Sequence, residues 1–188
     1  MARPQIGVMG SATPSFSQEE MERLRGIATQ LGKAIVAQDC ILVIGTTAGL
    51  PGMVCEAVQQ TGGFTVEISP AGSAQEHRVR YGPADAQADV RIFTGFGFKG
   101  RNVVNVRSAD IVLIFGGSIG TLNEFTIAYD EGRIVGVLEG TGGVADAVRS
   151  VLRACNKETE GRVVYEQDPE RLMAACLALL RTPSAPPP

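Results

Sequence analysis

The chain has 188 residues and a formal net charge of −3; hydrophobic residues make up 44% of it and charged residues 20%. This length and composition are typical of one globular domain rather than of a disordered chain. The small negative charge, without any run of Lys or Arg, argues against nucleic-acid binding and against a basic membrane-surface helix. There is no signal-peptide pattern and no apolar run of about 18 residues, so we expect a cytoplasmic protein with no membrane partner.

Short apolar runs of strand length alternate with helical patterns along the chain. The expected strands cover residues 6–9, 41–44, 64–68, 90–93, 111–115, 134–138 and 163–165. Ser17 and Glu20 have capping-box spacing at the start of the first helical pattern, which continues to residue 37. A second helical pattern runs from Pro51 to the Gly62–Gly63 pair, a later one covers residues 144–155, and the last one opens at Asp168.

Continuous apolar strands joined by helices indicate a parallel sheet that is covered on both faces. We therefore predict an α/β fold: a single Rossmann-like, doubly wound parallel sheet of six to seven strands with helices on both faces. This domain is expected to span residues 1–181. The last residues, 182–188, read "TPSAPPP" and are expected to form a disordered Pro-rich tail.

Glycine-rich stretches follow the first, second, fourth and fifth expected strands. In an open parallel sheet, ligands bind beyond the carboxyl ends of the strands, where these stretches fall. Glycines at such junctions let the backbone approach a ligand closely. At the first two junctions, "VMGSA" and "VIGTTAGLPG", the candidate ligand-binding residues are Gly10, Ser11, Gly45, Thr46 and Gly49.

The stretch "GFGFKG", residues 95–100, matches the G-x-G-x-x-G pattern of dinucleotide-binding proteins. Such a site requires an acidic residue at the end of the next strand, and that strand ends in Phe115–Gly116–Gly117 without a carboxylate. We therefore expect no dinucleotide and no other cofactor. The only histidine is His77 and the four cysteines form no C-x-x-C pair, so we expect no metal site and buried free thiols.

The stretch "IFGGSIGTLNEF", residues 114–125, leads from an apolar strand into a helix. Gly117, Ser118, Gly120 and Thr121 suit a phosphate cradle at the start of that helix. Two interpretations of Glu124 remain open. Thr121–Glu124 has capping-box spacing, so Glu124 either caps the helix or contributes a carboxylate to chemistry.

Other candidates are basic side chains near this sheet edge. Arg101 stands at the start of the preceding helix, where it is either a solvated surface residue or a ligand-binding one. We expect His77, Arg78 and Arg80 to lie in a polar loop after the third strand, facing solvent, although such a loop could close over a bound molecule.

Two segments resemble the LOG (Lonely Guy) family, which was once labelled as lysine decarboxylases. The segment "LVIGTTAGLPG" resembles that family's L-V-x-G-G-x-x-G-L-M-G, and "GGSIGTLNE" resembles its P-G-G-x-G-T-x-x-E motif; Arg101 lies at the matching distance upstream. The same fold and glycine junctions occur in molybdenum-cofactor carrier proteins and in DprA-related proteins. The segment "TGFGFKGRNVVN" is at least as similar to the carrier branch.

The resemblance implies a homodimer that binds a nucleoside monophosphate or a phosphorylated pterin. In the enzymes of this family an arginine and the motif glutamate support hydrolysis of the N-glycosidic bond, and these two map onto Arg101 and Glu124. The phosphate-binding glycine and threonine map onto Gly120 and Thr121. The enzyme motifs' proline, second glycine and lysine are replaced here by Gly116, Ser118 and Asn102. A non-catalytic carrier or sensor of a phosphorylated ligand is the alternative that the resemblance leaves open.

Overall fold

The protein forms one seven-stranded sheet in a computed structural model that describes residues 2–12, 16–45, 48–81, 88–157 and 159–182. All the strand pairs are parallel, and the order across the sheet is β4-β3-β2-β1-β5-β6-β7. The strands are β1 (Gln5–Gly10), β2 (Ile41–Ile44), β3 (Phe64–Ser69), β4 (Val90–Phe93), β5 (Ile111–Phe115), β6 (Ile134–Leu138) and β7 (Arg162–Glu166). The predicted α/β parallel sheet is confirmed, and each predicted strand is present with ends shifted by at most one residue.

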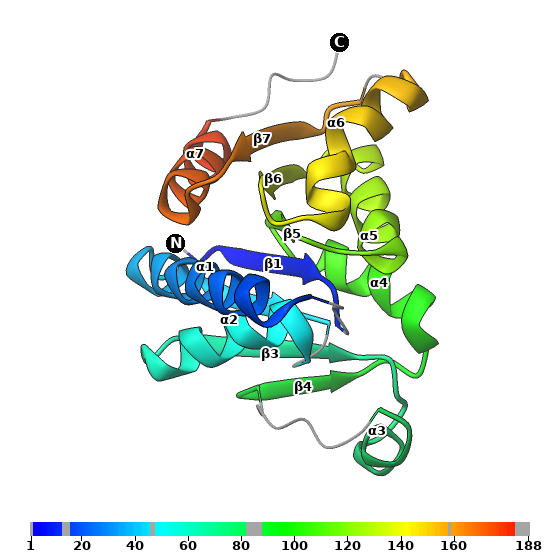
Figure 1. Cartoon of the computed structure of the whole chain (residues 1–188). Helices are drawn as coiled ribbons and strands as arrows, with labels where there is room; N and C mark the ends of the chain where they lie inside the picture. Colours follow the sequence, from blue (N-terminus) through cyan, green and yellow to red (C-terminus); the bar gives the residue numbers. More distant parts are fainter. Residues whose placement is uncertain (1, 13–15, 46–47, 82–87, 158, 183–188) are drawn as a thin grey trace.

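Helices cover both faces of this sheet (Figure 1). They are α1 (Gln18–Ala37), α2 (Gly49–Gln60), α3 (Ala74–Arg80), α4 (Gly97–Arg107), α5 (Ile119–Asp130), α6 (Gly143–Cys155) and α7 (Pro169–Arg181). One buried cluster joins the sheet to α1, α2 and α7, and a second joins it to α4, α5 and α6. The short helix α3 lies beyond the edge of the sheet that β4 forms (Figure 1).

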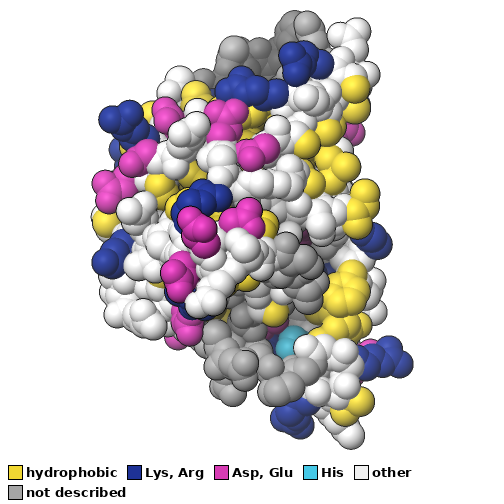
Figure 2. Space-filling view, viewed as in Figure 1, with side chains coloured by type: hydrophobic (Ala, Val, Ile, Leu, Met, Phe, Trp, Pro, Cys, Tyr) yellow, Lys and Arg dark blue, Asp and Glu magenta, His cyan; other side chains and the backbone are white. Residues whose placement is uncertain are grey.

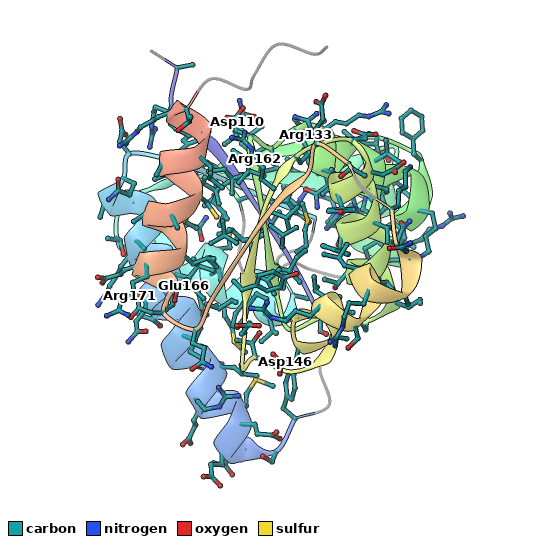
Figure 3. All side chains as sticks on the ribbon, turned by 90° about the horizontal axis from the view of Figure 1, so that it is seen from above. Asp110, Arg133, Asp146, Arg162, Glu166 and Arg171 are labelled. Atoms are coloured by element: carbon teal, nitrogen blue, oxygen red, sulfur yellow. The ribbon has the colours of Figure 1, made fainter. Side chains whose placement is uncertain are left out.

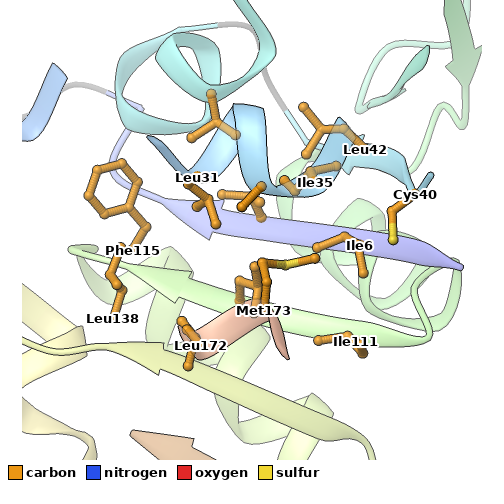
Figure 4. Close-up of a cluster of buried hydrophobic side chains, with 14 of the residues drawn as sticks. Ile6, Leu31, Ile35, Cys40, Leu42, Ile111, Phe115, Leu138, Leu172 and Met173 are labelled. Carbon is orange, nitrogen blue, oxygen red and sulfur yellow. The ribbon is translucent and has the colours of Figure 1, made fainter. Parts of the chain in front are cut away.

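The larger cluster shows how the sequence pattern builds the core (Figure 4). Leu31 and Ile35 are one helical turn apart on α1 and are fully buried against the sheet. Leu172 and Met173 of α7 reach the same cluster beside β1 and β5. The helices α1 and α2 pack closely at Gly32, where an added methyl group would lie 2.6 Å from Cβ of Ala57.

Two helix starts carry the caps that their sequences indicate. The Ser17–Glu20 capping box is present: Glu20 N–H donates to Ser17 Oγ at 3.2 Å, and Ser17 N–H donates to the Glu20 carboxylate at 3.0 Å. Asp168 is the N-cap of α7 and accepts a hydrogen bond from Arg171 N–H at 2.9 Å.

The expectation of a solvent-facing polar loop around His77 is wrong. Residues 74–80 form α3, which is capped by Ser73 through a 3.1 Å hydrogen bond from Glu76 N–H. Only 5% of His77 is exposed, and its ring packs near Tyr81 and Phe93. The burial of His77 could not be predicted from the sequence, because a short hydrophilic helix with one buried side chain shows no apolar periodicity.

Charged side chains line both ends of the strands (Figure 3). Asp110, Arg133 and Arg162 lie near the amino-terminal ends of β5, β6 and β7, whereas Asp146 and Glu166 lie toward the opposite edge. The Asp110 carboxylate accepts a 2.8 Å hydrogen bond from Gln5 N–H and thereby ties the start of β1 to that of β5. The amino-terminal edge is thus occupied by contacts that hold the sheet together.

Cys40, Cys55 and Cys176 are buried free thiols, as predicted, whereas Cys155 is free and exposed. Burial raises the pKa of Cys176 to about 12, so this thiol stays protonated. Except for Thr182, the predicted Pro-rich tail lies outside the described residues. Within the described ranges, no helix has the length and apolar character needed to cross a membrane.

The topology sets the position of a crevice. From β1 the chain adds β2, β3 and β4 on one side, and then returns to place β5 on the other side of β1. The connections after β1 and β5 therefore leave in opposite directions, which opens a crevice at the carboxyl ends of these two strands. The two strands approach closely there, because a methyl group on Gly10 would lie 2.6 Å from the carbonyl oxygen of Phe115.

Candidate functional site

A cavity of about 610 Å³ opens at this carboxyl edge of the sheet. Its walls come from the ends of β1 and β2, from β3 and α3, from the start of α2, from α4 and from the first half of α5. This volume lies in the range of small-molecule binding sites, and the position beside β1 and β5 is the one that the topology favours.

Most of the candidate residues from the sequence line this cavity: Gly10, Gly45, Arg101, Ser118, Gly120, Thr121 and Glu124. Ser11, Gly49 and Gly117 are not among the lining residues, and Thr46 lies outside the described residues. The structure therefore brings together residues from four separate segments of the chain. Their role in binding stays a prediction.

Two of the glycines outside the lining serve contacts within the backbone. Gly49 has φ +63°, and a methyl group there would lie 2.1 Å from the carbonyl oxygen of Ser11, which accepts a 3.0 Å hydrogen bond from Leu50 N–H. Gly117 has φ +109°, and its carbonyl accepts a 3.1 Å hydrogen bond from Val144 N–H at the start of α6. Side chains rarely adopt such φ values, so these positions favour glycine without any ligand.

The structure of the start of α5 shows which residue caps this helix. Ser118 is the N-cap, and its N–H donates to Thr121 Oγ1 at 3.3 Å. Glu124 lies in the second turn, so the capping-box interpretation of Thr121–Glu124 is wrong. The first turn of a helix presents N–H groups without intrahelical partners, which favour an anion. Gly120 lies on this turn, and a methyl group there would meet nothing within 4 Å.

Glu124 instead forms a buried ion pair with Arg101. Their side chains are each 8% exposed, and Arg101 Nη1 lies 3.7 Å from Glu124 Oε1. Burial raises the pKa of Glu124, and the Arg101 charge partly opposes that shift. Burial likewise lowers the pKa of Arg101, against the effect of Glu124. Perturbed pKa values of this kind are found at sites where a carboxyl group exchanges a proton with a substrate.

Two asparagines of α4 complete the surroundings of Glu124. Asn105 Nδ2 donates to Glu124 Oε1 at 3.2 Å and lies 3.0 Å from Met9 Sδ. With the Asn102 amide turned so that its nitrogen faces acceptors, this nitrogen donates to the carbonyl oxygen of Phe98 at 2.9 Å and to Glu124 Oε1 at 3.3 Å. Among the described residues, Asn105 Oδ1 and Arg101 Nε are buried without a hydrogen-bond partner. Buried polar atoms of this kind are normally satisfied, so this part of the cavity can accept further polar contacts.

A second buried polar group lies on β3 and α3. Glu67 Oε2 accepts a 2.5 Å hydrogen bond from Arg91 Nε, and Glu67 Oε1 lies 4.0 Å from His77 Nε2. Ser69 Oγ lies 2.8 Å from His77 Nδ1 and also accepts a 3.1 Å hydrogen bond from Ala71 N–H. The trio of Ser69, His77 and Glu67 resembles a catalytic triad in composition only. Ser69 is fully buried and is not among the cavity-lining residues, so it cannot act as a nucleophile there.

Sequence reasoning missed Glu67, His77 and Asn105 as lining residues. One signal was available for the first: in "FTVEIS" the polar Thr65, Glu67 and Ser69 alternate, which places them on one face of the strand. A second signal was the three-residue spacing of Asn102 and Asn105, which puts both amides on one side of α4.

The chain is similar to several known proteins in sequence and in fold. A protein of Archaeoglobus fulgidus described as uncharacterized is 32% identical over 135 residues, covering 72% of this chain and 80% of the relative. The crystal structure of TM1055 superimposes with a TM-score of 0.77 at 27% identity, over 94% of this chain and 98% of the other. The molybdenum cofactor (Moco) carrier protein of Chlamydomonas reinhardtii superimposes with a TM-score of 0.72 at 26% identity, over 97% and 100%.

The family comparison covers most of the chain. The family model described as "SLOG cluster4 family" matches residues 3–173, which include the whole cavity and all seven strands. The likeness to LOG-related and carrier proteins that the glycine motifs indicated is therefore confirmed at the level of the superfamily. This chain belongs to the SLOG cluster4 family.

Proposed function

We propose that this protein binds a phosphorylated, nucleotide-like small molecule in the cavity at the carboxyl ends of β1 and β5. The phosphate lies at the start of α5, on the N–H groups around Gly120 and Thr121, where the helix dipole and unpaired donors favour an anion. Arg101, whose Nε has no partner among the described residues, supplies a positive charge and donors beside it.

The leading reaction is hydrolysis of the N-glycosidic bond of a nucleoside 5′-monophosphate. The observation that carries it is the buried Arg101–Glu124 pair, 3.7 Å apart, in the wall of the cavity beside the proposed phosphate site. Breaking the ribose–base bond builds positive charge on the sugar, which a nearby carboxylate stabilises. Glu124 does not cap the helix, and burying a carboxylate is unfavourable, so we attribute its position to a role in the reaction.

In this reaction water adds to C1′ of the ribose, and the bond between C1′ and the base nitrogen breaks with its electron pair on that nitrogen. Glu124 takes the proton that the attacking water releases and passes it to the leaving base, so the products are the free base and ribose 5-phosphate and the carboxylate is regenerated. Asn105 holds the carboxylate in place through its 3.2 Å hydrogen bond. Arg101 orients the phosphate and limits the shift in the pKa of Glu124.

The second candidate is a carrier or sensor that binds the ligand without hydrolysing it. It is favoured by the likeness to the Moco carrier protein of Chlamydomonas reinhardtii. It is also favoured by Gly116, Ser118 and Asn102, which replace the proline, glycine and lysine of the enzyme motifs. In this alternative Glu124 and Arg101 bind and shape the ligand but transfer no proton.

The test measures binding and turnover in the same preparations. Calorimetry with AMP, GMP, CMP and UMP reports affinity, and release of ribose 5-phosphate reports hydrolysis. Glu124→Gln should keep the affinity and lower turnover by about 10²-fold or more. Gly120→Ala should weaken binding without unfolding, because its methyl group would project into open space. Glu131→Gln changes an ion-paired carboxylate at the other end of α5 and serves as the matched control.

Three results would separate the candidates. Release of ribose 5-phosphate that depends on Glu124 supports the hydrolase. Tight binding of a nucleotide by the wild type, with no release from any of the four, moves the assignment to the carrier. If none of the nucleotides binds and no phosphorylated molecule copurifies with the native protein, the proposed phosphate site is wrong.

A further inference from the structure

The cavity has a second polar end that the proposed hydrolysis does not use. Glu67, only 1% exposed, lies in its wall on β3, and His77 lies beside it on α3. Arg91 Nε donates a hydrogen bond to Glu67 Oε2. Glu67 Oε1 accepts no hydrogen bond from the described residues, and His77 Nε2 lies 4.0 Å from it. Because Glu67 lines the cavity, a ligand there can offer N–H donors to Oε1, so this end of the cavity favours a ligand that carries such donors.

An aromatic wall adjoins this carboxylate. The rings of Tyr81 and Phe98 pack edge to face with their centroids 5.2 Å apart, and both residues line the cavity. Phe98 is 57% exposed, and hydrophobic side chains gather on the side of the molecule that carries α4, next to the single histidine (Figure 2). Exposed aromatic rings at the mouth of a cavity are suited to packing against a planar heterocycle.

The two ends of the cavity are separated by a distance that one ligand can span. The proposed phosphate site follows β5, and Glu67 lies on β3, with β1 and β2 between them. Three strand spacings amount to roughly 14 Å, which is on the scale of a nucleoside monophosphate from its phosphate to the far edge of its base.

We propose that Glu67 and the Tyr81–Phe98 wall form a subsite for a 2-amino-4-oxo heterocycle, the ring edge that guanine and pterins share. On that edge a ring N–H and an exocyclic amino group stand side by side, and both donate to a carboxylate. Oε1 of Glu67 and the remaining lone pair of Oε2 accept them, while Arg91 holds the carboxylate in place through its hydrogen bond to Oε2. Adenine presents an acceptor nitrogen on the corresponding edge, which the carboxylate repels.

This subsite rests on the proposed function, because the phosphate positions the ring. The experiment measures the affinities of GMP, IMP, AMP, neopterin monophosphate and ribose 5-phosphate by calorimetry. GMP offers two donors on the relevant edge, IMP one, and AMP no ring donor. GMP should therefore bind about 10- to 100-fold more tightly than AMP, the scale of one bidentate base contact, with IMP between them. Comparing GMP with neopterin monophosphate identifies which source of this ring edge the site prefers.

Two variants test the residues. Glu67→Gln should reduce the affinity for GMP to about that for AMP and leave ribose 5-phosphate binding unchanged. Phe98→Ala changes an exposed side chain, so the fold should be kept. It should lower the affinity for GMP by about 5- to 100-fold and leave the affinity for ribose 5-phosphate unchanged. Glu131→Gln, the same chemical change in a distant ion-paired carboxylate, should alter neither affinity.

AMP binding as tightly as GMP and neopterin monophosphate would overturn the subsite and leave the phosphate site standing. The same holds if folded Glu67→Gln keeps the preference for GMP. If Glu67→Gln does not fold, an unchanged GMP affinity in Phe98→Ala overturns the subsite. Failure of all five compounds, ribose 5-phosphate included, would instead reject the phosphate site and the subsite with it.

Discussion

The guanidinium of Arg101 lies directly against the backbone of Gly45: a methyl group on Gly45 would lie 1.3 Å from Nη1 and 2.4 Å from Cζ of Arg101. The two residues belong to different elements, since Gly45 follows β2 and Arg101 is on α4. The absence of a side chain at Gly45 therefore creates the space in which the arginine reaches Glu124. From the sequence, Gly45 was a candidate ligand-binding residue; in the structure, the space that it leaves is filled by the guanidinium of Arg101.

Gly45→Ala should displace Arg101 and weaken binding of a nucleoside monophosphate about as much as Arg101→Ala does. The fold should survive, because the arginine is a flexible side chain that can move and Gly45 does not have a positive φ. Calorimetry with GMP on both variants, together with their melting temperatures, measures this. Wild-type affinity in a folded Gly45→Ala protein would show that the position of the guanidinium does not matter for binding.

The single histidine should make stability depend on pH in a defined direction. Burial lowers the pKa of His77 relative to its ordinary value, and the Glu67 charge only partly opposes this. Below about pH 6.5 the unfolded chain therefore binds more protons than the folded one, so the folded state loses stability as the pH falls toward the pKa of the buried ring.

His77→Asn should flatten this dependence, because the variant has no histidine at all. The melting temperature of the wild type should fall more steeply than that of the variant between pH 7.5 and pH 5.5. Urea unfolding at several pH values checks the same point. Identical slopes in the two proteins would mean that His77 has the same proton affinity in the folded and unfolded states.

Two glycines of α1 provide an internal comparison of helix packing. Gly32 faces α2, where an added methyl group would meet Cβ of Ala57 at 2.6 Å and the backbone nitrogen of Val58 at 3.0 Å. Gly26 is exposed, and a methyl group there would meet nothing within 4 Å. Gly32→Ala should destabilise the protein by about 1–3 kcal/mol through overpacking. Gly26→Ala should stabilise it by about 0.5–1 kcal/mol.

Urea denaturation of both variants gives the two free energies of unfolding. Since both substitutions make the same chemical change on the same helix, only their surroundings differ. Equal effects at the two positions would contradict the close approach of α1 and α2.

The protein is expected to form a dimer in solution. The resemblance to its relatives implies one, and large hydrophobic side chains stand exposed at the starts of α4 and α5: Phe96 is 66% and Ile119 is 74% exposed. Light scattering at micromolar concentration should give about twice the chain mass of 19.8 kDa. A mass of one chain over the whole accessible concentration range would contradict the dimer.

The strands could be predicted because each is a continuous apolar run in a sheet buried on both faces. Their order could not, since the apolar pattern of β5 does not specify that it pairs with β1. That pairing brings the ends of β1 and β5 together and creates the crevice. The pairing of Arg101 with Glu124 followed only from the family resemblance and not from the residue pattern, because it depends on how α4 and α5 pack, with 22 residues of chain between the two.

The glycine-rich junctions do lie at the edge of the sheet where the cavity opens, but not every glycine is there to leave room for a ligand. Gly116 has φ +60°, and its carbonyl accepts a 3.0 Å hydrogen bond from Ala145 N–H. Its conformation follows from the junction with α6, whereas Gly120 has open space around it. The sequence alone cannot distinguish Gly116, which its backbone conformation requires, from Gly120, which leaves room for a ligand. Only the surrounding structure does so.

The buried pair of Arg101 and Glu124 has a consequence for what the cavity does with charge. Arg101 favours the ionised form of Glu124 against burial, and the two opposite charges compensate one another. Both groups line the same cavity as the start of α5, and the packing of α4 against α5 fixes where each charge stands. The cavity thus presents a fixed dipole with Arg101 as its positive end and Glu124 as its negative end, and its orientation does not depend on the reorganisation of water.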